Sequence, residues 1–598
     1  MKQIKDKRID LEEEAANKLI SDIEESTNDS HRMFKAVREL KLGTTRKNVI
    51  KVKNSSGSYL LSDASKANII ADWFKDKLTD PEGPLETFQI IKPLNLPISE
   101  NEVTKAIKRL KLNRSTGPDG ISNEMIKASG PSFIKIYTKM INMSFETGVK
   151  IENITIGDLA PLPKPNKEQC PIENLRPIIL LNGMRKVLSL ITLKRIENNV
   201  NQYVGPYQHG YEEGQGCEDV VWSQKILTSI VLRKGWSFSK IGIDMSRAFD
   251  TIKRGVILYL LADAGCSEDD IALVRYLLSS TKLEIKVNKT KSKEFKTSLG
   301  SGQGDSLSGK LFTLYLAGAL NHLRAILDRP NPPISDESMP LEFEYVDDCD
   351  FIAEEMEELK QILPKIEQTF DEWNLKVNPT KTEYTEFYIS NDPRQRGSEK
   401  WRKNKTLGSL LCSRAEIQRR VNLGNAAFSK YEKLWINGKQ IDEKLKIKIY
   451  EATVVSIMLY NSGTWAAPKQ ILETLDASHR KHIRKILKIK WSDKISNEKL
   501  YEMSNLIPLS KRVEKARLRM LGKVLRQPEN KPTMLSLTFA MKKMETLTSI
   551  RGRPVINLLD TIIKDIESRG LKLNTADDIE PLRELAKDSK AWDEFIHT

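Results

Sequence analysis

The sequence predicts an α+β protein, with β-hairpins in the middle of the chain and a basic helical region at its C-terminal end. Leu341–Ala353 alternates apolar and polar residues on both sides of an acidic pair, which is the pattern of two short strands that fold back as a hairpin. Residues 471–530 place apolar residues at helical spacing and carry 15 Lys or Arg against 7 acidic residues. The first pattern predicts a sheet, and the second predicts the helical region and its charge.

Length and charge limit the class of protein. A chain of 598 residues is too long for one hydrophobic core, so we expect about three to five compact units. The 96 basic and 81 acidic side chains leave a net charge of +15, which favours a polyanionic partner such as nucleic acid. The chain has no long apolar run, so we expect no membrane span.

Cysteine usage and the first residues indicate an intracellular protein. The five cysteines stand far apart, without paired CxxC spacing, which predicts neither a zinc site nor a disulfide framework. The first residues lack the apolar core of a secretory signal.

The N-terminal part is expected to be helical and to end in a linker. Apolar spacing predicts amphipathic helices over Arg8–Leu40 and a helix over Ala64–Leu78, with a small hairpin over Asn48–Leu61 between them. Four prolines in residues 81–97 predict a linker that ends near Ile98.

The central part alternates helices with strands. Ser99 and Glu102 have the spacing of a capping box, so a helix is expected to start there. Further helices are expected over Ser122–Ala128, Met184–Val200, Leu311–Leu327 and Glu357–Asn374, with a last helix over Val555–Ser568. Strands are expected over Asp158–Lys164, Leu175–Leu180, Lys240–Asp244, the hairpin Glu284–Thr297 and Glu386–Ile389.

Asp347 and Asp348 form the acidic pair at the predicted hairpin turn. Adjacent carboxylates repel each other, so an ionised pair needs solvent or a cation, and hard divalent ions such as Mg²⁺ prefer oxygen ligands of this kind. Asp244, at the end of another predicted strand, would supply a third carboxylate if the two strands are neighbours. Taken alone, the acidic pair is more often an ordinary solvated turn, and Asp244 is equally a helix cap.

Other positions are candidates for nucleotide binding. Lys164 and Arg176 could meet across the predicted hairpin on a triphosphate, and ordinary solvated side chains are the alternative. Gln303 and Gly304 belong to a glycine-rich loop before a helix, which could approach a phosphate or a base pair. Phe249 could lie against a sugar ring or pack in the core.

Six sequence blocks occur in an order that resembles the reverse transcriptases of non-LTR retrotransposons of the LINE type, over residues 116–554. The blocks are Thr116-Gly-Pro-Asp-Gly-Ile121, Pro161-Leu-Pro-Lys164 with Leu175-Arg-Pro-Ile-Ile-Leu-Leu-Asn182, Ile243-Asp-Met-Ser-Arg-Ala-Phe-Asp250, Gly302-Gln-Gly-Asp-Ser-Leu-Ser308, Tyr345-Val-Asp-Asp348 and Asn378-Pro-Thr-Lys-Thr382. No single block is specific, but six in this order are.

The resemblance implies a right-hand polymerase with fingers, a palm of antiparallel strands and a helical thumb, which copies RNA into DNA. It implies that Asp244, Asp347 and Asp348 hold two Mg²⁺ ions, with Mn²⁺ as a substitute, for nucleotidyl transfer to a primer 3′-hydroxyl. The residues that it assigns to dNTP binding are Lys164, Arg176, Phe249, Gln303, Gly304 and Lys381. Phe249 matches a gate that excludes the ribose 2′-hydroxyl, and Lys381 matches a lysine near the pyrophosphate.

The resemblance also implies the partners and the division of the chain. The partners are an RNA template, a DNA primer or target and dNTPs, in the nucleus or the cytoplasm, with the oligomeric state left open. The expected units are a helical lead-in at 1–97, fingers with the start of the palm at 98–235, the palm at 236–393, the thumb at 394–470 and a basic helical region at 471–598. The basic residues expected to grip nucleic acid are Arg480, Lys481, Arg484, Lys485 and Lys488.

The sequence departs from the family near the expected template path and in the glycine-rich loop. Glu212 and Glu213 replace basic or neutral residues, which should weaken phosphate contact. Gly302, Ser306 and Gly309 stand where arginine and prolines are usual, which should loosen the loop.

Two alternative functions remain open on the sequence. No endonuclease precedes the polymerase blocks, so polymerisation without target cleavage is expected. The alternatives are a catalytically silent or domesticated RNA-binding protein and an RNA-dependent polymerase of ribonucleotides. The intact carboxylates argue against the first, and Phe249 argues against the second.

Overall fold

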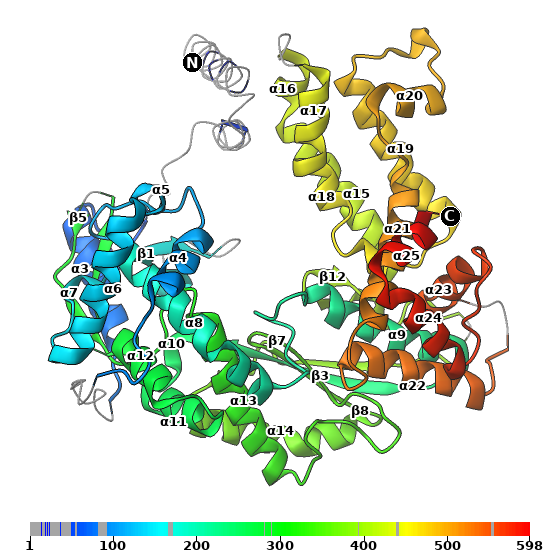
Figure 1. The fold of residues 1–598 in the computed structure, drawn as a ribbon. Helices are drawn as coiled ribbons and strands as arrows, with labels where there is room; N and C mark the ends of the chain where they lie inside the picture. Colours follow the sequence, from blue (N-terminus) through cyan, green and yellow to red (C-terminus); the bar gives the residue numbers. More distant parts are fainter. Residues whose placement is uncertain are drawn as a thin grey trace.

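The computed structural model describes residues 50–53, 57–81, 93–164, 171–279, 281–288, 290–392, 394–437, 442–551 and 555–597, with six single positions before residue 50. Apart from those positions, the helices predicted over Arg8–Leu40 lie outside the described residues, as does most of the predicted linker. Figure 1 shows a central sheet from which a mixed lobe rises on one side and a helical arm on the other.

The lobe is built on a sheet with the strand order β2-β1-β4-β5, in which β6 also pairs with β4. β1 runs antiparallel to β2 and parallel to β4. The strands are β1 (Ile156–Pro163), β2 (Leu175–Leu181), β4 (Thr281–Val287), β5 (Thr290–Lys291) and β6 (Phe295–Thr297). The predicted hairpins at residues 158–180 and 284–297 thus form, and they join in one sheet.

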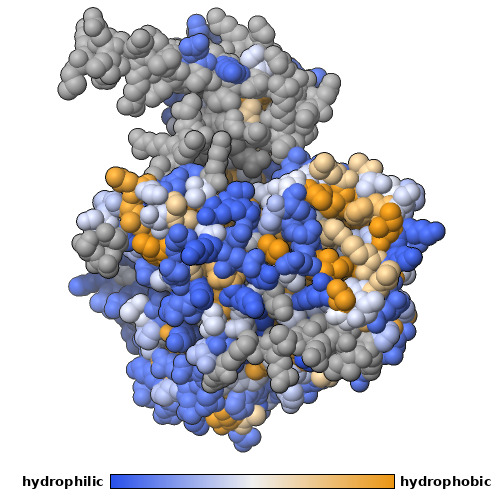
Figure 2. Space-filling view, turned by 90° about the vertical axis from the view of Figure 1, so that its left-hand side faces the viewer, coloured by the Kyte–Doolittle hydropathy of each residue, from blue (hydrophilic) through white to orange (hydrophobic). Residues whose placement is uncertain are grey.

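Helix α3 (Asp63–Lys77) covers this sheet. Its buried Ile70 and Phe74 share an apolar core with Leu159 of β1 and Leu283 of β4. The core therefore joins residues placed by the sequence in the lead-in, in the fingers and in the palm. Figure 2 views the molecule from the side of this lobe, where the surface is mostly hydrophilic with separate hydrophobic patches.

The other helices of the lobe surround its sheet and lead into the central part. The capping box of Ser99 and Glu102 forms as predicted, at the start of α4. These helices are α4 (Glu100–Arg109), α5 (Asn123–Ala128), α6 (Gly130–Thr147) and α7 (Glu152–Thr155).

The central sheet has the strand order β10-β3-β8-β7, with β9 also paired to β3. Its strands are β3 (Phe238–Ser246), β7 (Glu342–Tyr345), β8 (Asp348–Ala353), β9 (Lys376–Val377) and β10 (Glu383–Phe387). The strand predicted from Glu386 begins three residues earlier, because its pairing with β3 starts at Glu383, opposite Gly242.

Both faces of the central sheet are covered, because alternate side chains of a strand point to opposite faces. Ile241 and Ile243 of β3 pack in a core with the helices below the sheet. Phe238 packs in a second core with α9 and the C-terminal helices. The helices around the sheet are α8 (Gly183–Val204), α9 (Cys217–Lys234), α10 (Ala248–Thr251), α11 (Arg254–Asp263), α12 (Glu268–Leu278), α13 (Ser308–Ile326) and α14 (Met356–Glu372).

The helical arm begins after the short hairpin β11–β12 and stands beside the sheet (Figure 1). The elements of this part are β11 (Lys405–Thr406), β12 (Ser409–Leu410), α15 (Ser413–Lys430), α16 (Glu432–Asn437), α17 (Glu443–Tyr450), α18 (Ser456–Met458), α19 (Lys469–Ile486), α20 (Asn497–Ser504) and α21 (Leu509–Leu525). Ile417 of α15 and Ile483 of α19 belong to one core, so the boundary expected at residue 470 lies inside it.

The chain ends in four helices that pack back onto the central part. They are α22 (Pro532–Thr546), α23 (Leu558–Glu567), α24 (Ile579–Lys587) and α25 (Ser589–His597). The helix predicted over Val555–Ser568 is therefore not the last. No helix in the described ranges is long and apolar enough to cross a membrane.

Candidate active site

The acidic pair lies at the turn between β7 and β8, as predicted. The turn places Val346 at φ 57°, a conformation that β-branched residues rarely adopt. Buried Gln208 holds it there, because the Gln208 side-chain oxygen accepts a hydrogen bond of 2.7 Å from the Val346 backbone N–H. The strain at Val346 is thus maintained by a neighbouring loop, and it sets the direction of Asp347.

Asp244 lies directly beside the pair. Strand β3 runs antiparallel to β8, and Asp244 stands opposite Asp348 in the register. The carboxylates influence each other: burial and the charge of Asp244 raise the pKa of Asp347. Loss of hydration, together with Asp347, Asp350 and Asp244, raises the pKa of Asp348 to about 7. The structure therefore brings together the three carboxylates that the sequence singled out.

The chemistry of this group suits a divalent cation, because carboxylate oxygens are the ligands that Mg²⁺ prefers. Lys381 already supplies a positive charge, since its Nζ donates a hydrogen bond of 2.6 Å to Asp244 Oδ2. Within the described residues, however, no three His, Cys, Asp or Glu side chains lie close enough together to hold a metal ion as they stand. A metal site at Asp244, Asp347 and Asp348 would require these carboxylates to come closer together.

Four cations lie near this group: Lys164 and Arg176 on the lobe, Arg247 after β3, and Lys381 after β9. Burial, and after it the positive charges of Arg247, Lys381 and Arg176, lower the pKa of Lys164 below its usual value. Lys381 and Arg176 also act on Asp347, where they oppose the rise of its pKa. The residues predicted to bind phosphate therefore share one region with the carboxylates.

Arg247 was not among the predicted binding residues. It follows β3 in a left-handed conformation, φ 58°, and its guanidinium lies 4.1 Å from the ring centroid of Trp73 on α3. In the described part of the chain, no carboxylate lies within ion-pair distance of it. The visible signal was a basic residue three positions after Asp244, but its contact with Trp73, 174 residues away, could not be read from the sequence.

The glycine-rich loop lies against β2. The Ile179 N–H donates a hydrogen bond of 2.7 Å to the Gln303 carbonyl oxygen. Gly304 has φ 123°, and a Cβ there would lie 2.5 Å from the Ile179 oxygen, so only glycine fits. Gln303 Nε2 donates to Asp250, whose pKa burial raises to about 7. Gln303 thus links β2 to the short helix that follows Asp244.

Phe249 is half-buried and belongs to an aromatic cluster. It stacks on Phe312 of α13 with ring centroids 4.6 Å apart and meets the edge of Tyr211 at 6.3 Å. Core packing is thus one of its roles, as the sequence allowed.

Two expected defects are compensated in the structure. The Glu212 carboxylate forms an ion pair with the buried Lys310, so this charge does not stand free near a template path. The glycine-rich loop is tied together, because Ser308 Oγ donates to the carbonyl oxygens of Ser301 and Gly302, at 2.7 and 2.6 Å. Gly309 is required where it stands, since a Cβ there would lie 2.5 Å from the Tyr211 ring.

A cleft of about 510 Å³ opens beside the carboxylates, between the central sheet and the hairpin β11–β12. Asp244, Asp348 and Lys381 line one part of it, and Lys405 and Thr406 of the hairpin line another. The cleft is large enough for a small part of a ligand next to the carboxylates.

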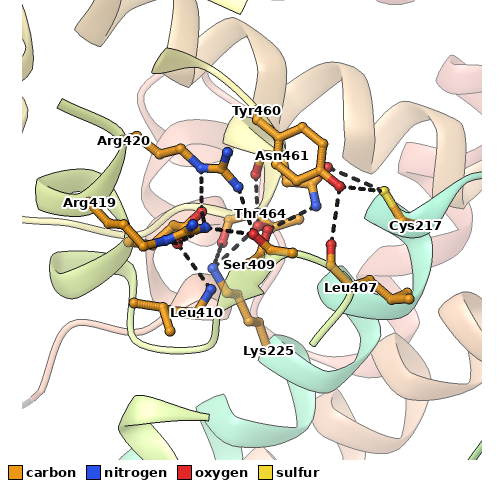
Figure 3. A network of polar contacts seen from close by, with 12 residues as sticks. Cys217, Lys225, Leu407, Ser409, Leu410, Arg419, Arg420, Tyr460, Asn461 and Thr464 are labelled. Atoms are coloured by element: carbon orange, nitrogen blue, oxygen red, sulfur yellow. Dashed lines mark hydrogen bonds and ion pairs between the residues drawn. The ribbon is translucent and has the colours of Figure 1, made fainter. Parts of the chain in front are cut away.

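A buried polar network fixes the hairpin at the edge of this cleft (Figure 3). Thr406 Oγ1 of the hairpin donates to Gln224 Oε1 of α9 at 3.2 Å, and the Tyr460 hydroxyl donates to the Leu407 carbonyl oxygen at 3.1 Å. On the cleft side, Lys240 Nζ of β3 donates to Thr406 Oγ1 at 3.2 Å and pairs with Asp350 Oδ2 at 3.1 Å. The hairpin is therefore held from α9, from the arm and from the sheet.

The basic residues predicted to grip nucleic acid lie on or just after α19, and three of the five are already engaged. Arg480 pairs with Glu473, and Lys485 Nζ lies 2.5 Å from a Glu432 carboxylate oxygen. Arg484 donates to the Ile495 carbonyl oxygen at 2.9 Å. Lys481 and Lys488 are exposed and make no such contact with the described residues.

Comparison with known proteins adds the remaining observation. Residues 162–411 match the family model described as "Reverse transcriptase (RNA-dependent DNA polymerase)". The chain is 24% identical over 272 residues to the "Transposon TX1 uncharacterized 149 kDa protein" of Xenopus laevis, which covers 45% of this chain and 20% of that protein. It is 20% identical to the "RNA-directed DNA polymerase from mobile element jockey" of Drosophila funebris, over 55% of this chain and 37% of that protein.

A third relative is the "Probable RNA-directed DNA polymerase from transposon BS" of Drosophila melanogaster, 24% identical over 52% of this chain and 34% of that protein. The chain thus matches between a fifth and two fifths of the length of these three relatives. A structure of apo telomerase from Candida tropicalis aligns with a TM-score of 0.30 and 15% identity, over 45% of this chain and 57% of that one.

Proposed function

We propose, on the premise that residues 162–411 are a reverse transcriptase domain related to those of non-LTR retrotransposons, that this chain is an RNA-directed DNA polymerase. The observation that carries the proposal is the register of the central sheet, which sets Asp244 opposite Asp348 and next to Asp347. Three carboxylates beside a cluster of cations are what the transfer of a nucleotide from a triphosphate requires.

The carboxylates have a defined task in this proposal. Asp244, Asp347 and Asp348 would hold divalent metal, as two Mg²⁺ ions or Mn²⁺ in their place. The bound metal supplies activation of the primer 3′-hydroxyl and neutralisation of the triphosphate charge. The strained turn at Val346 orients Asp347, and Lys381 keeps Asp244 paired with a cation until the substrate arrives.

The cations bind the triphosphate. Lys164 and Arg176 approach from the lobe, Arg247 from the end of β3, and Lys381 from the loop after β9. Ammonium and guanidinium groups both bind phosphate oxygens, and a polyanion relieves the repulsion between these neighbouring cations, which adds to burial in lowering the pKa of Lys164. Arg247 is added to the predicted set because its charge acts on Lys164 more strongly than those of the other two cations.

The remaining residues select and position the nucleotide. Phe249, fixed between Phe312 and Tyr211, limits the space beside the sugar and favours a deoxyribose. Gln303 and Gly304 form a flat backbone surface against β2, on which the new base pair rests. The primer end occupies the cleft next to Asp348, in front of the hairpin β11–β12.

In this proposal, the parts of the structure correspond to the parts of a right-hand polymerase. The lobe corresponds to fingers, the central sheet with its helices to the palm, and the upright helices α15–α19 to the thumb. An RNA template paired with a DNA primer then lies between lobe and arm. Residues on both sides of positions 97, 235 and 470 share apolar cores, which supports parts that extend across these boundaries.

Primer extension tests the proposal. Purified protein is given oligo(dT) on poly(rA) with Mg²⁺ and either dTTP or UTP, and incorporation is measured. We expect dTMP to be added at least about tenfold faster than UMP, because Phe249 crowds a 2′-hydroxyl.

The same assay separates the two alternatives. A silent RNA-binding protein adds neither nucleotide, and the pairing of Lys381 with Asp244 is the one observation that favours it. A polymerase of ribonucleotides adds UMP at least as fast as dTMP. Either result removes the proposal.

A further inference from the structure

Trp491 is the most exposed large hydrophobic side chain of the described residues, at 95%. It belongs to the segment that joins α19 to α20, and this segment lies at the end of the arm farthest from the central sheet (Figure 1). Tryptophan buries more apolar area than most residues and is rarely left in solvent without a partner to bind. Nearly the whole indole ring is therefore available to a ligand.

The segment around Trp491 is fixed. Ile489 and Ile495, on its two sides, pack against the apolar core of the arm. Asp493 Oδ2 accepts a hydrogen bond of 2.7 Å from the Lys490 backbone N–H. Because Arg484 also binds the Ile495 carbonyl oxygen, the segment is held down at both ends. The fold partly buries the two isoleucines and leaves the tryptophan exposed on an ordered turn.

Positive charge surrounds the ring. Residues 481–494 contain six Lys or Arg and one Asp. Lys488, Lys490 and Lys494 are exposed on either side of Trp491, and within the described ranges their ammonium groups form no ion pair. A polyanion complements this surface, since each bound phosphate releases counterions.

We propose that Trp491, with Lys488, Lys490 and Lys494, is a stacking platform for an unpaired base of single-stranded nucleic acid. An exposed aromatic face among cations fits a base and its neighbouring phosphates. A duplex offers only phosphates here, because its bases are stacked inside. The inference rests on the proposed function, in which a template strand is unpaired before it is copied.

Binding of a fluorescein-labelled 20-nucleotide oligouridylate, followed by anisotropy, tests the platform on the full chain. Trp491→Ala is expected to weaken binding about tenfold, whereas Trp491→Phe keeps most of the affinity. The matched control is Tyr259→Ala on α11, which removes another exposed aromatic ring, 69% exposed, and should leave binding unchanged. Replacement of Lys488, Lys490 and Lys494 by Gln should lower the slope of log affinity against log salt by about 2.

Two results would overturn the inference: affinity of Trp491→Ala within twofold of wild type, or an equal loss for a blunt RNA duplex. Primer extension separates this failure from failure of the proposed function. At saturating poly(rA)–oligo(dT), Trp491→Ala is expected to extend at the wild-type rate, because Trp491 lies away from the carboxylates. If even the wild type fails to extend, the polymerase proposal falls, while the binding result still decides the platform.

Discussion

At the scale of single residues, the site depends on groups whose neighbours come from distant parts of the chain. Lys381 pairs with Asp244 across 137 residues, and Arg247 stacks on Trp73 from α3. Asp244, Asp347 and Asp348 could be singled out from the sequence, because each is a carboxylate at the end of a predicted strand or at a predicted turn. Such local features were not enough for Arg247, because its role depends on a cation–π contact that only the fold creates.

Arg247→Gln should raise the KM for dTTP by about tenfold or more with a smaller change in kcat. A charged hydrogen bond to phosphate contributes about 1.5–3 kcal/mol, and its loss is felt when the substrate binds. Trp73→Ala should move KM in the same direction, because it releases the guanidinium without removing it. Steady-state kinetics with Arg275→Gln, an exposed arginine on α12, as the control would check this; equal KM values for all four proteins would contradict it.

At the scale of elements, the hairpin β7–β8 is the best example of what a sequence predicts and what it leaves out. The alternation of apolar and polar residues placed both strands and the turn to within about one residue of their positions in the structure. The strain at Val346 and the glutamine that holds it were invisible, because Gln208 is 138 residues away and gives no local pattern. Helix α9 was missed for a related reason: residues 219–232 are buried on every side, so no polar stripe marks the helical period.

Gln208→Leu should lower kcat strongly while leaving the KM for dTTP nearly unchanged. The substitution leaves the N–H groups of Val346 and Gly210 without an acceptor, which costs about 1–3 kcal/mol each and lets the turn relax. The aspartates then lose their orientation, but the cations that bind the triphosphate stay. Steady-state kinetics, with a melting curve to show that the variant is folded, would test this prediction. An unchanged kcat in a folded variant would contradict the claim that the strained turn orients the aspartates.

The arm contains two buried histidines that should make it sensitive to acid. Burial lowers the pKa of His479 to about 3 and that of His482 to about 4. The unfolded arm takes up protons below its ordinary histidine pKa of about 6.5, whereas the folded arm does not. Stability is therefore full above pH 6.5 and falls as the pH drops toward 4, by about 2 kcal/mol for each histidine at pH 5.

Hydrogen exchange of α19 at pH 7.5 and pH 5.0, corrected for the intrinsic rate, would measure this loss. The double variant His479→Gln and His482→Gln is the control, because carboxylates with raised pKa values elsewhere act in the opposite direction in both proteins. Protection of α19 should fall in the wild type relative to the variant as the pH drops. The same change in both proteins would show that the histidines do not titrate on opening.

At the scale of the whole molecule, the parts are joined more closely than composition suggests. The core that contains Trp222 of α9 also contains Phe343 of β7 and Leu559 of α23. Charge runs and prolines mark changes along the chain, but they do not report which segments return to an earlier core. The fold class, the acidic hairpin and its carboxylates could therefore be predicted from the sequence, whereas the order of the strands in the sheets and the contacts between distant segments could not.

A chain truncated after residue 470 should be insoluble or should melt at a much lower temperature than the full chain. Truncation removes nearly all of α19 and the whole of α20–α25, and it exposes the apolar side of α9, including Leu227 and Ile230, which are 0% exposed in the full chain. Exposed apolar patches of this size promote aggregation. Soluble yield and melting temperature would be compared; a soluble, active truncated protein would mean that residues 471–598 are an independent module.

The central claim is that Asp244, Asp347 and Asp348 carry out nucleotidyl transfer. Its most direct measurement is dTMP incorporation on poly(rA)–oligo(dT) by wild type and Asp347→Asn, at matched occupancy of the template. We expect the wild type to extend the primer, and Asp347→Asn to bind the template normally while its rate falls at least about 100-fold. Extension by Asp347→Asn at the wild-type rate, or loss of template binding along with activity, would contradict the assignment.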